Sequence, residues 1–195
     1  NLPGQSDLDF TISIPVDPLL PHSARYDQWQ DLRDTVRRAM LARFGADVVE
    51  QAKKCINIDG SELAPIDLVP CLSRPFAIGK TSLNGIEFWT STQPPRHIIS
   101  HPDIRAINSE ARDAAASGAY RRLARTLKAG RIATAFPKEQ APSYMLESSA
   151  YAVPSELMSG EPSHDMAAYI QYMQSVVAAP TPQLMNLSGT TPLIG

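Results

Sequence analysis

The order of hydrophobic and polar residues predicts strands in the first half of the chain. Residues 7–14 alternate strictly, with apolar side chains at every second position, which is typical of a half-buried strand. Residues 25–44 carry apolar side chains three and four positions apart instead, as one face of a helix does. Gly45 is placed to end that helix. The apolar helix face is formed by Tyr26, Trp29, Leu32, Val36 and Met40.

Two apolar runs predict further strands. Residues 64–72 form the longer run, and Pro65 and Pro70 restrict it to an edge or to the ends of its pairing, because proline has no N–H to donate to a neighbouring strand. The shorter run, at 55–58, precedes the turn pair Asp59-Gly60.

A hairpin is expected after these runs. Residues 76–78 and 86–90 are mostly apolar, and they flank the pair Asn84-Gly85. Asn-Gly pairs favour the tight turns that join antiparallel strands. The spacing therefore predicts that the turn of the hairpin is at this pair.

Beyond about residue 100 the pattern becomes helical. Segments 103–116 and 119–132 are rich in Ala, Arg and Leu, Pro142 can open a third helix that Pro154 ends, and Ser163 can cap a fourth. The expected core faces are Tyr120, Leu123, Ala124 and Leu127 in the second helix and Met166, Ile170, Met173 and Val177 in the fourth.

The order of elements predicts an α+β fold with two lobes. Residues 1–100 are expected to form a lobe with a mixed β-sheet, and residues 101–195 a helical lobe whose tail from 180 onward is irregular. The chain has 18 basic and 20 acidic side chains and a net charge of −2, which argues against a surface coated for nucleic acid. No apolar run approaches the roughly 18 residues that span a bilayer, so a cytoplasmic protein without membrane contact is expected.

Three aspartates are candidate metal ligands. Asp7 and Asp9 are two positions apart on the first strand, so their side chains point the same way, roughly 7 Å apart. Asp67 lies in an apolar strand, where an unpaired carboxylate is costly. If the two strands pair, the three carboxylates can hold divalent cations, an arrangement used in phosphoryl transfer. For Asp7 and Asp9 alone, a solvated strand face is the simpler interpretation.

Two further groups are candidates for binding phosphate and base. No acidic residue occurs between Ala114 and Lys138, and a solvated helix face is the simpler interpretation of the basic residues there. Ser143 and Tyr144 follow Pro142 at an expected helix start, where a hydroxyl can meet phosphate and a ring can stack on a base. For Tyr144 alone, packing in the core is the simpler interpretation. The basic residues that share one helix face are Arg121, Arg125 and Lys128.

The histidines and cysteines give weaker signals. His97 and His101 are four residues apart, a spacing that suits a metal on a helix, but no acidic motif of a metalloprotease accompanies them. Capping, or packing against the second lobe, is therefore the preferred interpretation. Cys55 and Cys71 are too few for a disulfide scaffold and are expected to be buried thiols.

Taken together, these segments resemble a known family. Residues 6–9 and 66–71 look like the metal-binding motifs of the polymerase-β-like nucleotidyltransferases. Residues 118–128 and 142–147 resemble one branch of them, the cyclic GMP–AMP synthase-like and bacterial dinucleotide-cyclase-like enzymes called CD-NTases. The resemblance implies an enzyme with its active site in a cleft between the two lobes. Such enzymes join ATP, GTP or other nucleoside triphosphates into cyclic di- or oligonucleotide signals, which in bacteria serve anti-phage defence.

The resemblance also implies roles for the three acidic residues. Asp7 and Asp9 would bind Mg²⁺ or Mn²⁺ together with the donor triphosphate. Asp67 would complete the metal site and help to deprotonate the acceptor hydroxyl. In the family, a Gly-Ser pair that cradles phosphate stands roughly ten residues before the position of Asp7, whereas this chain has only six residues there. The phosphate cradle is therefore expected to be missing from this chain.

The remaining implied roles concern the helical lobe. Lys128 and Ser143 would hold donor phosphates, and Tyr144 would stack on the donor base. A regulatory protein partner is left open. Two other functions also stay open: transfer of a nucleotide to an RNA, protein or small-molecule acceptor, and a non-catalytic module that binds nucleotides.

Overall fold

The computed structural model describes residues 8–17, 19–59, 65–78, 81–180, 183–190 and 192–194. The chain divides into two compact units, with the boundary between Pro102 and Asp103, and each unit is described by itself. The strands and helices confirm the expected α+β fold. Among the described residues, none of the helices is long and apolar enough to cross a membrane.

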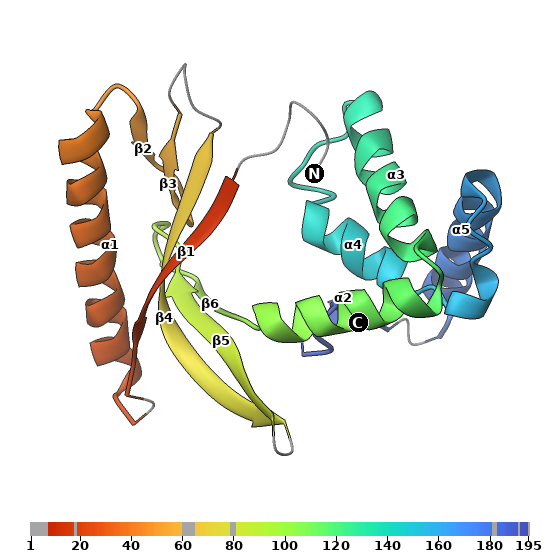
Figure 1. The fold of residues 1–195 in the computed structure, drawn as a ribbon, viewed down its shortest axis with the longest axis horizontal. Helices are drawn as coiled ribbons and strands as arrows, with labels where there is room; N and C mark the ends of the chain where they lie inside the picture. Colours follow the sequence, from red (N-terminus) through yellow and green to blue (C-terminus); the bar gives the residue numbers. More distant parts are fainter. Residues whose placement is uncertain are drawn as a thin grey trace. The chain divides into compact units, whose positions relative to one another are not determined.

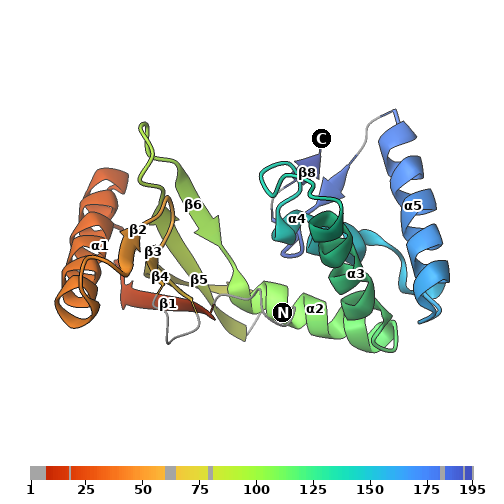
Figure 2. The ribbon, with the colours of Figure 1, turned by 90° about the horizontal axis from the view of Figure 1, so that it is seen from above.

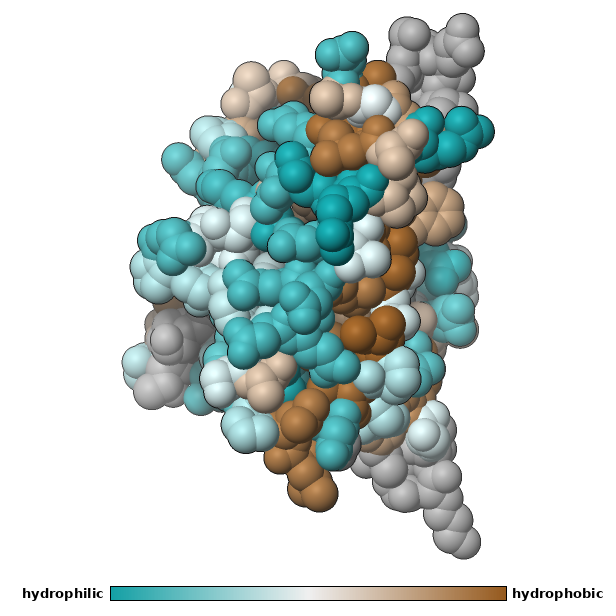
Figure 3. Space-filling view, turned by 90° about the vertical axis from the view of Figure 1, so that its left-hand side faces the viewer, coloured by the Kyte–Doolittle hydropathy of each residue, from teal (hydrophilic) through white to brown (hydrophobic). Residues whose placement is uncertain are grey.

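The first unit is a sheet with one long helix packed against it (Figure 1). Helix α1 (His22–Phe44) buries Trp29 and Val36, and Gly45 follows it as predicted, with its N–H bonded to the Leu41 carbonyl at 2.9 Å. Hydrophilic residues cover most of the surface on the side of α1 (Figure 3). The strands are β1 (Leu8–Pro15), β2 (Val49–Gln51), β3 (Ile56–Ile58), β4 (Ile66–Ile78), β5 (Thr81–Trp89) and β6 (His97–Ser100).

Strand β4 lies inside the sheet, so the first of the two alternatives for residues 64–72, an edge position, is wrong. β1 pairs with it in parallel along residues 66–73. β3 pairs with residues 66–68 and β5 with residues 72–78, both antiparallel and both on the edge of β4 opposite β1. Pro70 falls between these two pairings, where its missing N–H breaks no bond of the ladder. Its carbonyl instead accepts a hydrogen bond from Trp29 Nε1 at 2.9 Å, which ties α1 to the sheet.

The predicted hairpin exists, but its turn is elsewhere. β4 and β5 pair as far as Ile78 and Thr81, so Asn84 and Gly85 lie within β5 rather than at the turn. A Cβ at Gly85 would stand 2.9 Å from the Arg74 carbonyl oxygen and 3.2 Å from His101 Nδ1. Gly85 is thus explained by the close approach of these neighbours.

A buried carboxylate, Glu87 on β5, is held by three cationic or ring nitrogens. Its side chain is 1% exposed and lies 2.9 Å from Arg25 Nε, 3.2 Å from Arg74 Nη1 and 3.0 Å from His97 Nε2. Burial acts to raise the pKa of Glu87, but the hydrogen bond and charge of Arg25, with His97 and Arg74, outweigh it and lower the pKa. This carboxylate therefore joins α1 to the sheet as an ion.

The second unit has four helices of more than one turn among its described residues (Figure 2). Tyr120, Leu123 and Ala124 are buried as expected, and they pack against Ala150 and Val153. The elements are α2 (Pro102–Ala115), α3 (Ala119–Ala133), α4 (Ser143–Ala152), the short helix η1 (Ser155–Leu157), α5 (Pro162–Ala178), β7 (Leu184–Met185) and β8 (Pro192–Ile194).

Three expectations for the end of the chain are wrong in whole or in part. Ile170 and Val177 on α5 are 48% and 65% exposed. Tyr169 and Tyr172 pack against the core instead, so the buried face of α5 is the one that carries these two rings. The cap of α5 is Glu161 rather than Ser163, since the Glu161 carboxylate accepts the His164 N–H at 2.8 Å. The tail is not wholly irregular either, because β7 and β8 pair antiparallel.

Candidate active site

Three polar residues meet across adjacent strands of the first unit. Asp9 on β1 is paired in register with Asp67 on β4, and Asn57 on β3 is paired with the same Asp67 from the opposite edge. Neighbouring strands lie about 4.8 Å apart, and partners in register project from the same face. The pairing of the two strands, on which the predicted site depends, is present, and it places Asp9 beside Asp67.

Asn57 was not among the residues predicted from the sequence. Its amide Nδ2 donates a hydrogen bond to Asp67 Oδ1, which holds that carboxylate in one orientation. The only local signal for Asn57 is its position as a polar residue between Ile56 and Ile58. Its partner is ten residues away, and the pairing of strands, not the local pattern, brings the two together.

Cys55 reports on the charge around these carboxylates. The pKa of its thiol is raised to about 11, mainly by burial and in part by the neighbouring charges of Asp67 and Asp9. Both aspartates thus lie close enough to Cys55 to act on its pKa, although burial has the larger effect. Cys71 is buried as predicted, whereas Cys55 is only half-buried.

The oxygen donors of this site fit a hard divalent cation. Asp9 is exposed and Asp67 half-buried, and paired carboxylates on one face are ligands that Mg²⁺ and Mn²⁺ accept. The third predicted ligand, Asp7, lies outside the described residues. Within the described residues, no three His, Cys, Asp or Glu side chains form a metal-binding group, so the predicted set of three stays a prediction.

The residues predicted in the second unit gather where α3 meets the start of α4. Lys128 on α3 forms an ion pair with Glu147 on α4, and Arg105 Nη2 lies 3.4 Å from the same carboxylate. The Arg131 guanidinium donates to the Ala141 carbonyl at 2.7 Å and to Ser143 Oγ at 3.4 Å. Lys128, Arg131 and Ser143 therefore form one polar surface within this unit.

Tyr144 is 50% exposed, so it is not a core residue, and the simpler interpretation of its position is wrong. It is the second residue of α4, directly after Ser143. A half-exposed ring next to the first turn of a helix is available for stacking. In that turn the N–H groups of Met145 and Leu146 are bonded to the Pro142 carbonyl at 2.9 and 3.2 Å. Arg121, from the predicted basic face, lies 3.6 Å from Asp113.

The chain matches no family model. Its sequence is similar to that of cyclic UMP-AMP synthase from Rhodothermus marinus (strain SG0.5JP17-172), with 24% identity over 192 residues, 89% of this chain and 66% of the relative. The chain thus spans just under two thirds of the length of this curated relative.

Two solved structures share the fold. Rhodothermus marinus CdnE c-UMP-AMP synthase, solved with Apcpp and Upnpp, has a TM-score of 0.76 and 21% identity. Elizabethkingia meningoseptica CdnE cyclic dinucleotide synthase, solved with GTP and Apcpp, has a TM-score of 0.78 and 20% identity. Each comparison covers 97% of this chain and 70% of the other. In sequence and fold the chain is thus similar to cyclic-nucleotide synthases of the CD-NTase family. The resemblance found in the motifs is thereby confirmed.

The histidines have no part in the CD-NTase motifs, and the structure explains both. His97 lies on strand β6 rather than on a helix and stacks on Trp89 with 4.7 Å between ring centroids. His101 meets the ring of Phe76 edge-on at 4.7 Å. Both rings thus make ring contacts within the first unit.

Proposed function

We propose that this chain is a CD-NTase, a metal-dependent nucleotidyltransferase that joins nucleoside triphosphates into a cyclic di- or oligonucleotide. The observation that carries the proposal is the register of β1 and β4, which pairs Asp9 with Asp67 on one face. The fold shared with cyclic dinucleotide synthases supports it. The similarity in sequence to a cyclic UMP-AMP synthase supports it as well.

In this proposal the carboxylates of the first unit do the chemistry. Asp9 and Asp67, with Asp7, would hold Mg²⁺ or Mn²⁺, and the bound metal would supply activation of the attacking hydroxyl and neutralisation of charge on the leaving pyrophosphate. Asp67 also accepts the proton of the acceptor hydroxyl. Asn57 holds Oδ1 of Asp67, so the orientation of that carboxylate is set before the substrate binds.

The second unit contributes recognition of the donor nucleotide. Lys128 and Ser143 bind its phosphates, and the exposed ring of Tyr144 stacks on its base. Lys128 is paired with Glu147, so phosphate binding requires that its ammonium exchange this carboxylate for the triphosphate. Arg105, which also approaches Glu147, remains to balance the charge of that carboxylate after the exchange.

The test is to incubate the protein with each of the four labelled triphosphates, singly and in pairs, with Mg²⁺ or Mn²⁺. The relatives carry names of different cyclic products, so each nucleotide must be tried. After digestion with phosphatase, a resistant labelled product of low mass supports the proposal. The matched control is Asp67→Asn, which keeps the shape of the side chain and removes the charge.

Other outcomes would redirect the assignment. Label on an RNA, a protein or a small-molecule acceptor would indicate the alternative transfer reaction. Binding of nucleotide without any product, in wild type and Asp67→Asn alike, would indicate a non-catalytic module. A role in anti-phage defence and a regulatory protein partner, both implied by the resemblance, stay predictions.

A further inference from the structure

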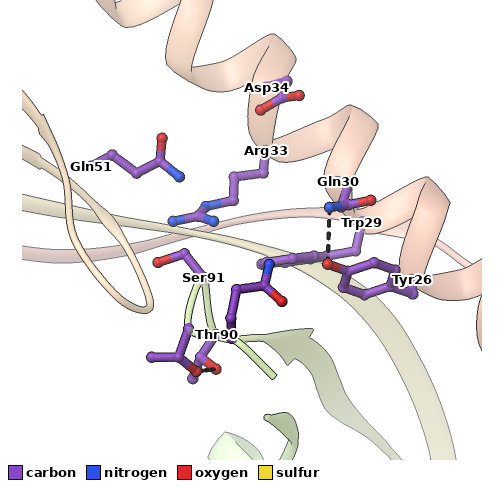
Figure 4. Close-up of a pocket in the computed structure, with 10 residues that line it drawn as sticks. Tyr26, Trp29, Gln30, Arg33, Asp34, Gln51, Thr90 and Ser91 are labelled. Carbon is purple, nitrogen blue, oxygen red and sulfur yellow. Dashed lines mark hydrogen bonds between the residues drawn. The ribbon is translucent and has the colours of Figure 1, made fainter. Parts of the chain in front are cut away.

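A pocket lies in the first unit, between α1 and the segment that follows β5 (Figure 4). It encloses about 180 Å³. None of the residues that line it is among those predicted for catalysis or nucleotide binding. Its principal lining residues are Tyr26, Trp29, Gln30, Arg33, Gln51 and Ser91.

The side chain of Arg33 enters this pocket from α1, toward Gln51 and Ser91 (Figure 4). Arg33 is only 5% exposed, and burial lowers the pKa of its guanidinium. The guanidinium also lies over the ring of Trp29, 5.3 Å from the centroid. A buried positive charge is therefore held at the wall of this pocket.

The acceptors around this charge are neutral. The Ala52 carbonyl accepts from Nη2 at 2.9 Å, and the Gln51 amide oxygen, in the orientation that satisfies both groups, accepts from Nη1 and Nη2 at 3.1 Å. Nε has no hydrogen-bond partner within the part of the chain that the structure describes. Asp34 also lines the pocket, but its side chain is exposed. Across the described ranges, no carboxylate lies within ion-pair distance of Arg33.

Such an arrangement is costly unless something compensates the charge. Buried ions in proteins are normally paired with an opposite charge, because neutral hydrogen bonds replace only part of their hydration. We propose that this pocket is a binding site for a small organic anion, whose carboxylate or phosphate group pairs with Arg33. Tyr26 and Gln30, joined by a 2.9 Å hydrogen bond, offer an amphipathic wall for the rest of the ligand. The volume limits the ligand to a molecule much smaller than a nucleoside triphosphate.

The structural alternative is that Arg33 only ties α1 to the backbone at Ala52. That role predicts a loss of stability when Arg33 is replaced, and no response to anions in the wild type. Both tryptophans of the chain, Trp29 and Trp89, lie in the first unit with ring centroids 5.7 Å apart. Intrinsic fluorescence therefore reports on this pocket rather than on the nucleotide-binding residues of the second unit.

The experiment titrates the full chain, without nucleotide or divalent metal, with inorganic phosphate and separately with malonate, against sodium chloride at matched ionic strength. We expect a saturable change of tryptophan fluorescence, with a rise in melting temperature, for phosphate, malonate or both. The anion that saturates identifies the preferred head group. A response equal to that of sodium chloride overturns the proposal.

Variants complete the test. Arg33→Met should weaken the saturating response at least tenfold, and Arg38→Met, on the exposed face of the same helix, should leave it unchanged. If Arg33→Met does not fold, Ser91→Phe serves instead, because it fills the pocket from its exposed rim and leaves Arg33 in place. An undiminished response in Ser91→Phe or in folded Arg33→Met overturns the proposal.

Discussion

Replacing Asn57 with leucine tests whether the strand register builds the active site. Leucine is similar in size to asparagine but has no N–H to donate, so the hydrogen bond from Nδ2 to Asp67 Oδ1 is lost. A hydrogen bond to a charged group contributes about 1.5–3 kcal/mol. Loss of a residue that orients a metal ligand costs about 10–100-fold in metal affinity or activity. The two ranges agree, since about 1.4 kcal/mol corresponds to a factor of ten.

The assay measures pyrophosphate release against Mg²⁺ concentration, together with direct binding of Mn²⁺ in the absence of nucleotide. For Asn57→Leu we expect the metal concentration for half-maximal rate to rise by about 10–100-fold. Ser13→Ala is the matched control, because Ser13 is exposed on β1, four residues beyond Asp9. An unchanged metal requirement in a folded Asn57→Leu protein would refute the reasoning. A lower melting temperature alone would show that Asn57 is structural.

Four further predictions follow from the same structure. Asp9→Asn and Asp7→Asn should each abolish product formation. Because Asp9 is exposed, Asp9→Asn should change the free energy of unfolding by no more than about 0.5 kcal/mol, as measured by urea titration. Lys128→Ala should raise the triphosphate concentration needed for half-maximal rate more than it lowers stability, and an unchanged requirement would remove Lys128 from the site. Tyr144→Ala should weaken ATP and GTP binding about tenfold or more, from the loss of about 1–3 kcal/mol of stacking, whereas Tyr144→Phe should be nearly neutral in calorimetry. Glu87→Gln should lower the free energy of unfolding by about 3–5 kcal/mol. Because the pKa of Glu87 is lowered on folding, its contribution to wild-type stability should be complete above the ordinary glutamate pKa of about 4.3 and should decline as pH falls below that value. A wild-type stability that does not change with pH in this range would contradict the ion-pair assignment.

The sequence alone determined what depends on neighbours along the chain. A helix repeats every 3.6 residues and a strand every two, so the apolar spacing of residues 25–44 was sufficient to predict α1 and its buried Trp29. The same reasoning located α3 and the strand that carries Asp9. Motif order was sufficient to predict the family, because phosphoryl transfer needs particular residue types at a few positions whatever the rest of the chain does.

The tertiary structure decided what depends on residues far apart in the chain. Pairing of β1, β3 and β4 placed Asn57 against Asp67, and the gap between β3 and β5 accommodated Pro70 inside the sheet. The same is true of the pocket around Arg33, whose walls come from α1, β2 and the segment after β5. A local pattern records only that a residue is polar or apolar. The charge, acceptor or void that it meets is contributed by strands and helices that packing alone brings together.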